Sequence, residues 1–238
     1  MTKVKNDLFD YKDMYIYQNE EDFKFSLDSV LLSEYVNLNP RIHNILDFCT
    51  GNAPVPLILS TKTNADIVGF EIQKEIYELG VDSVLLNKKE KQIKLINDNI
   101  KNIQKYYSKN YFDVITCNPP YFKVNETSLI NGNKKLSIAR HEIELVLEDI
   151  FVLSSQYLKD NGVLYMVHRS ERIDEMFILA NKYGMNIKNM QLIATNDDMK
   201  PYLVLIKCVK NSKFGVKISP TLNINGLKTY QNIFGGVK

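Results

Sequence analysis

The sequence predicts a doubly wound α/β fold with a mostly parallel sheet. Short apolar, β-branched segments alternate with longer helical segments from about residue 42, polar or turn-forming residues follow the strand-like segments, and no repeat or long Gly/Ser linker divides the 238 residues. Repeated strand-helix units place successive strands side by side in parallel, and right-handed crossovers put helices on both faces. A chain of this length can bury a sizeable core within one such unit.

Seven segments have the composition of strands and five have the pattern of helices. The predicted strands are residues 42–49, 66–71, 93–97, 112–117, 162–168, 185–194 and 202–209. The predicted helices are residues 54–60, 73–87, 99–107, 143–158 and 173–183. In such sheets the ligand binds beyond the carboxyl ends of the strands, where the strand order reverses. We therefore expect the functional residues at those ends.

Residues 1–38 precede this pattern and are expected to form a small N-terminal extension to a main domain of residues 39–238. Residues 15–18 resemble one strand of a hairpin, and residues 23–36 resemble a helix with Ser26 as its N-cap. The apolar residues expected to pack on the core are Val30, Leu31, Leu32 and Tyr35.

The composition is that of an ordinary soluble protein, with 45% hydrophobic and 24% charged residues. No stretch approaches the roughly 18 apolar residues that a membrane span requires, and the first residues lack the apolar segment of a signal peptide. We therefore expect a cytoplasmic protein without a membrane segment. The cysteines Cys49, Cys117 and Cys208 are widely spaced in or beside apolar runs, which predicts reduced thiols and no metal site.

The net charge of +2 conceals an asymmetry along the chain. From Met199 to the C-terminus there is no Asp or Glu. The lysines in that segment are Lys200, Lys207, Lys210, Lys213, Lys217, Lys228 and Lys238. A basic segment of this kind can bind a polyanion, although a solvated surface is the alternative. We expect Lys210 and Lys213 to contact nucleic acid in preference to a second lysine cluster at residues 88–94.

Two strand ends carry residues suited to a nucleoside ligand. The first strand is followed by Gly51, where a glycine beside a helix start lets the backbone approach a ligand closely. The second strand ends at Glu71, 20 residues further on. An acidic residue at this position can accept hydrogen bonds from ribose hydroxyls. A solvated charge at a strand end is the alternative for Glu71.

The third strand ends at Asp98, which is placed either to accept a hydrogen bond from an adenine amine or to cap the next helix. The fourth strand ends with Asn118-Pro119-Pro120-Tyr121. The side-chain oxygen of Asn118 and the carbonyl of Pro119 can both accept from one planar amine, and the ring of Tyr121 can stack on it. Prolines fix φ and do not donate, so the acceptors stay aimed. This combination predicts chemistry at an aromatic amine.

With these residues the chain resembles the S-adenosylmethionine-dependent amino-methyltransferases that carry an Asn-Pro-Pro-aromatic motif. Asp47, Cys49, Gly51 and Glu71 precede the motif at the spacings of that group. Within it, the chain is most similar to bacterial methyltransferases that act on the N6 amine of the adenine flanking the anticodon of valine tRNA. The similarity extends over about residues 15–209 and includes Gln18 and residues 23–32, 47–52 and 139–142.

The resemblance implies a seven-stranded class I methyltransferase (Rossmann-like) fold and a set of roles for the strand-end residues. The cofactor-binding residues would be Asp47, Gly51, Glu71, Asp98 and Asn118. The residues that hold the target base would be Asn118, Pro119, Pro120 and Tyr121. Phe122 would stack on the target base beside Tyr121. Arg140 and His141 would contact the RNA or the cofactor, and ordinary helix-start residues without a role are the alternative. Residues 123–140 are long and polar enough for a lid over the substrate, and a plain surface loop is the alternative. The small-residue motif after the first strand is often written with three glycines, whereas here Cys49 and Ala53 flank Gly51.

Several other functions share parts of this pattern. The same motif serves methyltransferases that act on ribosomal RNA, DNA or a protein glutamine. A nucleic-acid-binding protein without catalysis would have no need of Asn118 or Glu71. A nicotinamide dehydrogenase shares the fold but not the Asn-Pro-Pro strand end. We therefore expect an N6-adenine tRNA methyltransferase that acts as a monomer without a metal ion.

Overall fold

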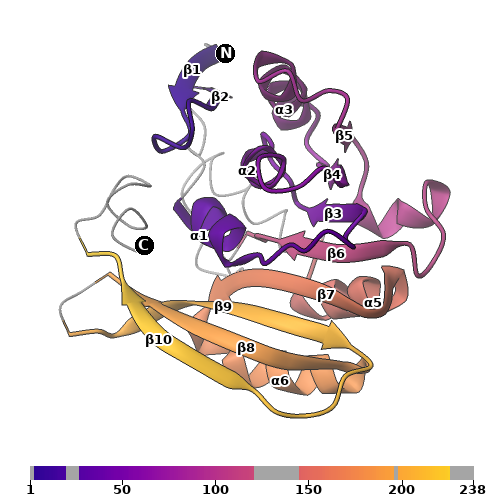
Figure 1. Cartoon of the computed structure of the whole chain (residues 1–238), viewed down its shortest axis with the longest axis vertical. Coiled ribbons are helices and arrows are strands. Elements are labelled where there is room, and N and C mark those ends of the chain that lie inside the picture. Colours follow the sequence, from indigo (N-terminus) through magenta and orange to yellow (C-terminus); the bar gives the residue numbers. More distant parts are fainter. Residues whose placement is uncertain (1–2, 20–26, 121–144, 196–197, 226–238) are drawn as a thin grey trace, which may run out of the picture.

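The computed structural model describes residues 3–19, 27–120, 145–195 and 198–225 (Figure 1). Within these residues the main sheet has eight strands in the order β10-β8-β9-β7-β6-β3-β4-β5. The strands are β3 (Asn44–Phe48), β4 (Asp66–Phe70), β5 (Ile93–Ile96), β6 (Phe112–Cys117), β7 (Leu158–Arg169), β8 (Met185–Ala194), β9 (Pro201–Lys210) and β10 (Lys217–Asn223). The pairs from β5 to β7 are parallel, and β9 runs antiparallel to β7 and β8. The predicted doubly wound α/β fold is confirmed.

Strand β10 corrects the expected number of seven strands. It pairs in parallel with β8 at one edge of the sheet, and its register shifts between Ser219 and Leu222. Pro220 lies at this irregularity, where the missing N–H of a proline costs no ladder bond. Its sequence, KISPTLN, has few apolar residues and a central proline, so no strand was predicted there.

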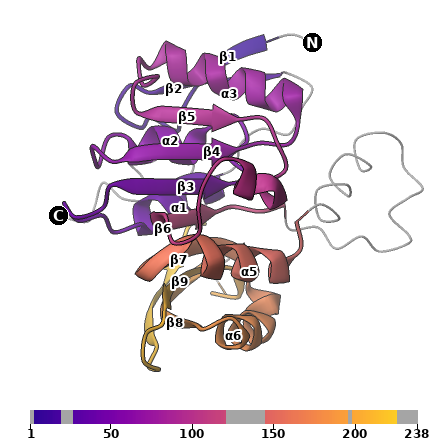
Figure 2. The ribbon, with the colours of Figure 1, turned by 90° about the vertical axis from the view of Figure 1, so that its right-hand side faces the viewer.

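Helices cover both faces of the sheet, and side chains that alternate along each strand feed two apolar clusters. The helices are α1 (Leu27–Tyr35), α2 (Pro54–Leu59), α3 (Lys74–Leu86), α5 (Leu147–Tyr157) and α6 (Ile173–Lys182), with short 3₁₀ helices η1 (Ile100–Lys105) and η3 (Ser170–Arg172). Figure 2 shows α5 and α6 on one face with α1 and α2 on the other. On β3, Ile45 packs in the cluster of α1 and α2, whereas Leu46 and Phe48 pack in that of α5 and α6.

Several predicted elements have other bounds in the structure; α5, for example, begins at Leu147. The helix expected over residues 99–107 is the six-residue 3₁₀ helix η1, whose N-cap is Asn99. Strand β7 begins at Leu158 and not at residue 162, because Leu158 already pairs with Phe112 before a register shift that restarts pairing at Val163. Asn161 accommodates this irregularity with a left-handed φ of 61°.

The N-terminal residues form the expected hairpin, β1 (Lys3–Asp7) with β2 (Tyr15–Asn19), which packs on α3. The Asn87 side chain accepts from the backbone N–H of Tyr15 at 3.1 Å and donates to the carbonyl of Tyr15 at 2.7 Å. Ile16 is fully buried and belongs to the same apolar cluster as α1 and α2. The hairpin therefore completes the core that supports the strand ends. The boundary at residue 38 stays a prediction.

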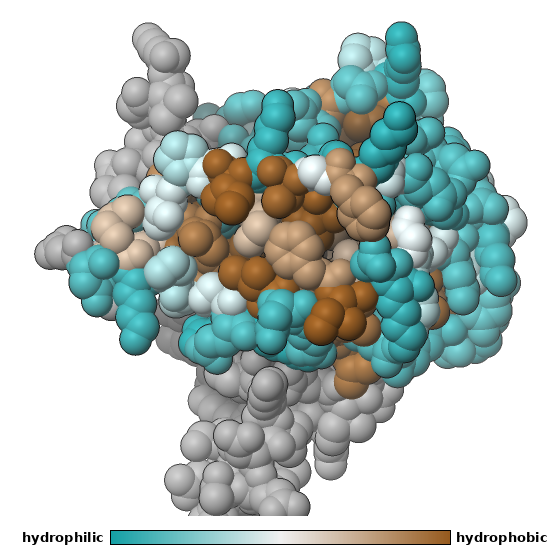
Figure 3. Space-filling model, turned by 90° about the horizontal axis from the view of Figure 1, so that it is seen from below, coloured by the Kyte–Doolittle hydropathy of each residue, from teal (hydrophilic) through white to brown (hydrophobic). Residues whose placement is uncertain are grey.

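Exposed apolar side chains gather at the lower edge of the molecule, which α6, β8 and β10 form (Figure 3). The large hydrophobic residues exposed on α6, on β10 and in the turn before β10 are Phe177, Ile178, Phe214, Val216 and Ile218. The short β10 with its irregular register limits edge-to-edge pairing here, a common protection of sheet edges. Across the described residues, no helix has the length and apolar character needed to span a membrane.

Candidate active site

The predicted site residues on β3, β4, β5 and β6 meet at one edge of the sheet. The chain proceeds from β3 outward to β4 and β5 and then returns to the other side of β3 as β6. This return is a reversal of strand order, which is where ligands bind in sheets of this kind. The turn around Gly51 therefore lies between the strand end at Glu71 and the strand end at Asn118.

Glu71 and Gly51 are joined directly. One carboxylate oxygen of Glu71 accepts from the backbone N–H of Gly51 at 3.0 Å, and the other accepts from the N–H of Gln73 at 2.8 Å. Glu71 is 5% exposed, and burial raises its pKa. A carboxylate has about four acceptor positions, so two backbone bonds leave capacity for hydroxyl donors of a ligand. Glu71 is thus a buried part of the turn and not a solvated strand-end charge.

The turn after β3 is left-handed at three alternate positions, Cys49 (φ 52°), Gly51 (58°) and Ala53 (73°). Left-handed backbone costs an L-residue about 1–2 kcal/mol, whereas glycine adopts it readily. The three-glycine form of the motif therefore matches the backbone that this turn requires. Here Cys49 and Ala53 adopt the same backbone with small side chains, so the departure from the motif leaves the turn intact.

The turn is supported from below by glycines that the sequence analysis did not single out. A Cβ added to Gly69 on β4 would lie 2.6 Å from the hydroxyl oxygen of Thr50, and one added to Gly80 on α3 would lie 3.1 Å from the carbonyl of Gly51. Both positions therefore allow close packing of β4 and α3 against the turn. A glycine inside a predicted helix and one near a strand end were the available signals.

A methyl group at Gly51 itself would meet no atom within 4 Å, so its Cα faces open space. We expect Gly51→Ala to lower the free energy of unfolding by about 1–2 kcal/mol through backbone strain. We also expect it to weaken S-adenosylmethionine binding more than the control variant does, because the added methyl group enters the ligand space. Gly184→Ala is the matched control, since Gly184 also has a left-handed φ of 68° but lies after α6. Calorimetric titration and thermal unfolding of both variants test this. Equal cofactor affinity in both would contradict it.

Asp47 is buried beneath this turn, with 1% exposure, and its carboxylate accepts from the hydroxyl of Thr116 at 2.5 Å. Burial raises the pKa of Asp47 to about 7, against the lowering effect of the hydrogen bond from Thr116. A carboxylate that is costly to ionise is well placed to gain from a nearby cationic ligand group.

The raised pKa has a consequence for stability. The folded protein holds the Asp47 proton more tightly than the unfolded chain, so this residue lowers the free energy of unfolding as pH rises from about 4 to about 7. Asp47→Asn should remove that decline and make the cofactor-free protein more stable at pH 8 by up to about 4 kcal/mol, with little gain at pH 4. Thermal unfolding at the two pH values, with exposed Asp66→Asn as control, measures it. A variant less stable than wild type at pH 8 would contradict this account.

Asp98 does not cap the following helix. The cap is Asn99, whose side chain accepts from the N–H of Lys101 at 2.9 Å. The Asp98 carboxylate instead accepts from the amide of Asn102 at 2.7 Å and the hydroxyl of Tyr106 at 2.9 Å. The bond from Asn102 is the main cause of a lowered pKa of Asp98. Asp98 is thus an ionised acceptor at the end of β5.

Asn118 follows β6 and is half-buried, with Pro119 buried behind it. Its side-chain nitrogen donates to the hydroxyl of Ser29 on α1 at 3.0 Å. Ser29 was not among the predicted site residues, since it is distant in the sequence and lies in the predicted N-terminal extension. The residues Tyr121, Phe122, Arg140 and His141, the helix cap Ser26 and the predicted lid at 123–140 lie outside the described residues.

The lysines expected to contact nucleic acid are not at this edge. The ammonium group of Lys210 donates to the side chain of Asn110 at 2.7 Å and to the carbonyl of Leu158 at 2.8 Å, and the residue is 9% exposed. Asn110 and Leu158 lie where β6 and β7 begin, at the opposite edge of the sheet. This placement corrects the expectation for Lys210, because its ammonium group is hydrogen-bonded inside the protein. Lys213 is exposed beyond the same edge.

The three cysteines are free thiols, two of them buried and Cys49 half-buried. The thiols of Cys49 and Cys117 are neighbours at the ends of β3 and β6, and burial raises the pKa of Cys117. In the described part of the chain, no three His, Cys, Asp or Glu side chains are grouped closely enough to hold a metal ion.

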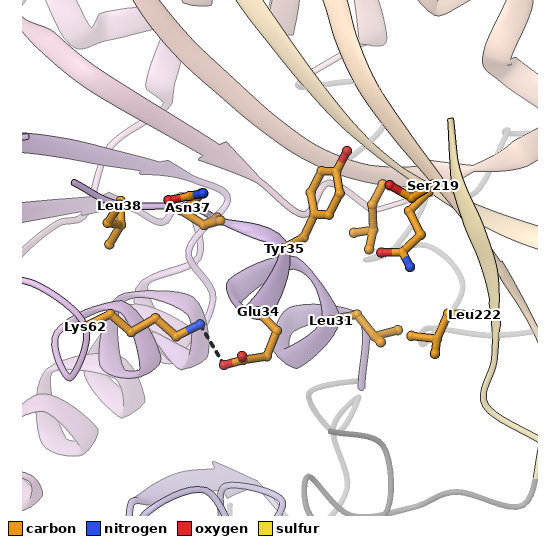
Figure 4. A pocket seen from close by; sticks show the side chains of 11 residues that line it. Leu31, Glu34, Tyr35, Asn37, Leu38, Lys62, Ser219 and Leu222 are labelled. Carbon is orange, nitrogen blue, oxygen red and sulfur yellow. Dashed lines mark ion pairs between the residues drawn. The ribbon is translucent and has the colours of Figure 1, made fainter. Parts of the chain in front are cut away.

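A separate pocket of about 480 Å³ lies beside the C-terminal half of α1 (Figure 4). The ion pair between Glu34 and Lys62, 2.6 Å apart, forms one wall, and Leu222 of β10 lines another. None of the predicted site residues lines this pocket. The pocket is therefore distinct from the strand-end site.

The sheet and the strand-end site define the class I methyltransferase fold. A solved structure described as a predicted O-methyltransferase from Agrobacterium tumefaciens superimposes with a TM-score of 0.64 at 16% identity, covering 83% of this chain and 87% of that one. Such low identity shows the fold alone. No protein-family model matches the sequence.

Sequence relatives define the resemblance more narrowly. The chain is 27% identical over 194 residues to a protein from Cytophaga hutchinsonii named tRNA1(Val) (adenine(37)-N6)-methyltransferase, covering 82% of this chain and 80% of the relative. A protein of the same name from Phocaeicola vulgatus is 26% identical over 203 residues, covering 85% and 84%. The resemblance inferred from the motifs is confirmed.

Proposed function

We propose that the protein is an S-adenosylmethionine-dependent methyltransferase that acts on the N6 amine of an adenine in the anticodon loop of valine tRNA. One observation supports this proposal most strongly. The Gly51 turn, which is bound to Glu71, and the Asn118-Pro119-Pro120 strand end lie at the same reversal of strand order. The names of the relatives support the substrate. The alternatives with the same chemistry are ribosomal RNA, DNA or a protein glutamine.

The residues present fit this cofactor. The open space over the Cα of Gly51 admits the nucleoside, and Glu71 beside it is suited to the ribose hydroxyls. Asp98 is an ionised acceptor suited to the adenine amine, and a cationic methionine portion close to Asp47 would offset the costly ionisation of that carboxylate. When bound, the cofactor supplies a methyl group on a positively charged sulfur, so no metal is needed to activate it.

At the target amine the protein's own task is positioning. The side-chain oxygen of Asn118 and the carbonyl oxygen of Pro119 each accept one hydrogen bond from the N6 amine. Two such bonds favour the pyramidal nitrogen, whose lone pair is then directed at the methyl carbon. Methyl transfer would form the bond between N6 and carbon as the carbon–sulfur bond broke, would leave the electron pair of the broken bond on sulfur, and would release one N6 proton to solvent. Positioning and electrostatics supply the rate.

The RNA contacts are proposed from sequence and charge. The target adenine must leave its stack to reach Asn118, and aromatic rings stack on bases turned out in this way. We assign that role to Tyr121 and Phe122, and contacts with the surrounding RNA to Arg140 and His141. Lys213 is exposed beyond the opposite edge of the sheet, so we assign it a contact with RNA distant from the target base. Lys210 is omitted because its ammonium is held by Asn110 and Leu158. The protein acts in the cytoplasm. It acts as a monomer, which size-exclusion chromatography with light scattering would test.

Incubation with radiolabelled S-adenosylmethionine tests the substrate class. Total tRNA from cells that lack the modification is expected to take up label, and digestion should release it as N6-methyladenosine. Ribosomal RNA, duplex DNA and a glutamine peptide are parallel acceptors. Label in one of these and none in tRNA would overturn the tRNA assignment. Cofactor binding without transfer to any acceptor would favour a non-catalytic binding protein.

A further inference from the structure

We propose that Ser29 is a positioning residue for the methyl-transfer reaction, which holds the amide of Asn118 in the orientation that receives the target amine. The observation is the hydrogen bond of 3.0 Å from the side-chain nitrogen of Asn118 to the hydroxyl oxygen of Ser29. The inference rests on the function proposed above for Asn118.

The hydroxyl of Ser29 is fixed relative to the sheet. Ser29 is 4% exposed in the first turns of α1, and Val30, Leu31 and Leu32, which follow it, are at most 1% exposed. These side chains belong to the apolar cluster that packs against Ile45 of β3. A helix held by three buried side chains gives Ser29 little freedom to move. The bond therefore connects Asn118 to a rigid point outside its own strand.

An asparagine amide has two different ends, and only one suits an amine substrate. The oxygen end accepts the N6 protons, whereas the NH₂ end would face another donor. With its nitrogen bonded to Ser29, Asn118 has its oxygen on the side of the amide away from α1. In the observed bond the Ser29 hydroxyl oxygen accepts from the amide nitrogen of Asn118, which holds the NH₂ end of the amide toward α1. Without the hydroxyl, the Asn118 amide loses its contact with α1 before the substrate arrives.

The same helix provides a control. Ser33 is fully buried on α1 and donates to the carbonyl of Ser29 at 2.7 Å, so its alanine variant also removes a buried hydroxyl from α1. The side-chain hydrogen bond of Ser33 stays within α1 and does not reach Asn118. A general weakening of α1 would therefore appear in both variants, and a loss of Asn118 orientation only in the first.

The experiment compares wild type, Ser29→Ala and Ser33→Ala by two measurements. The first is steady-state methylation of unmodified tRNA. Ser29→Ala should lower kcat by about tenfold, the effect of one neutral hydrogen bond, with unchanged KM for tRNA and unchanged cofactor affinity. Ser33→Ala should keep the wild-type kcat. A wild-type kcat in Ser29→Ala, or equal losses in both variants, would overturn the proposal.

The second measurement does not depend on methylation. The side-chain NH₂ signals of Asn118 are assigned in a ¹H–¹⁵N NMR spectrum by their absence in Asn118→Asp. In wild type, the proton bonded to Ser29 should exchange slowly with solvent, and Ser29→Ala should accelerate that exchange and shift the signal, whereas Ser33→Ala should not. Unchanged signals in Ser29→Ala would overturn the positioning role. A wild-type protein that shows these signals but methylates no tRNA would instead overturn the proposed function.

Discussion

Asn118→Ala is expected to lower the single-turnover rate of methyl transfer to tRNA by about 10²–10³-fold, the range seen when one preorganised group that stabilises a transition state is removed. The amide oxygen accepts a hydrogen bond from the N6 amine and so favours the pyramidal nitrogen, whereas alanine has no acceptor. Cofactor affinity should change little, because Gly51, Glu71 and Asp47 remain. Rapid-quench measurements with radiolabelled cofactor give the rate, and calorimetric titration gives the affinity.

Asn186→Ala is the matched control for this variant. Asn186 lies on β8, and its side-chain nitrogen donates to the carbonyl of Ser212 at 2.6 Å, near the edge opposite the site. It should retain the wild-type rate. A wild-type rate in Asn118→Ala would remove Asn118 from the mechanism. An equal loss in Asn186→Ala would attribute the effect to folding and not to chemistry.

Glu71→Gln is expected to have the second largest effect, mainly on cofactor binding. Both oxygens of Glu71 accept from backbone N–H groups, those of Gly51 and Gln73. The NH₂ end of a glutamine would face one of these donors and leave it unsatisfied, which costs about 1–3 kcal/mol. The turn then loses one of its hydrogen bonds to the end of β4, while the bond from the N–H of Thr50 to the carbonyl of Phe70 remains, and the ribose loses a charged acceptor. We expect cofactor affinity to fall by more than tenfold and the thermal midpoint to fall with it.

Glu75→Gln separates this effect from a change of net charge, because Glu75 is exposed in the first turn of α3. Calorimetric titration should give the wild-type affinity for Glu75→Gln and a weakened one for Glu71→Gln. Wild-type affinity in Glu71→Gln would show that the carboxylate supports neither the turn nor the ligand.

The features that were predictable from the sequence are local ones. Strands β6 and β8 have the predicted bounds because the apolar residues of each segment give way to polar or turn-forming residues at its ends. Gly51, Glu71 and Asn118 come together because carboxyl ends of parallel strands share one edge, which follows from the strand order alone. The left-handed backbone at Cys49 was not predictable from residue type, since a thiol-bearing residue there adopts a conformation that favours glycine.

The features that escaped prediction depend on distant parts of the chain. Lys210 looked like a surface charge, but Asn110 and Leu158 come to it from segments 100 and 52 residues away. Ser29 lies 89 residues from Asn118, so no spacing rule connects them. Strand β10 forms because β8 offers a free edge, and Pro220 hides it from any pattern of alternating apolar residues. Tertiary contacts supply each of these features.

The central claim concerns one nitrogen in one loop, and a pair of valine tRNA transcripts tests it directly. One transcript carries the natural adenine beside the anticodon, and the other carries guanine at that position alone. Methylation followed by nuclease mapping and mass spectrometry should locate one N6-methyladenosine at that adenine in the first transcript and no methyl group in the second. Equal methylation of both transcripts, or label at another nucleotide, would contradict the assignment of the anticodon-loop adenine as substrate.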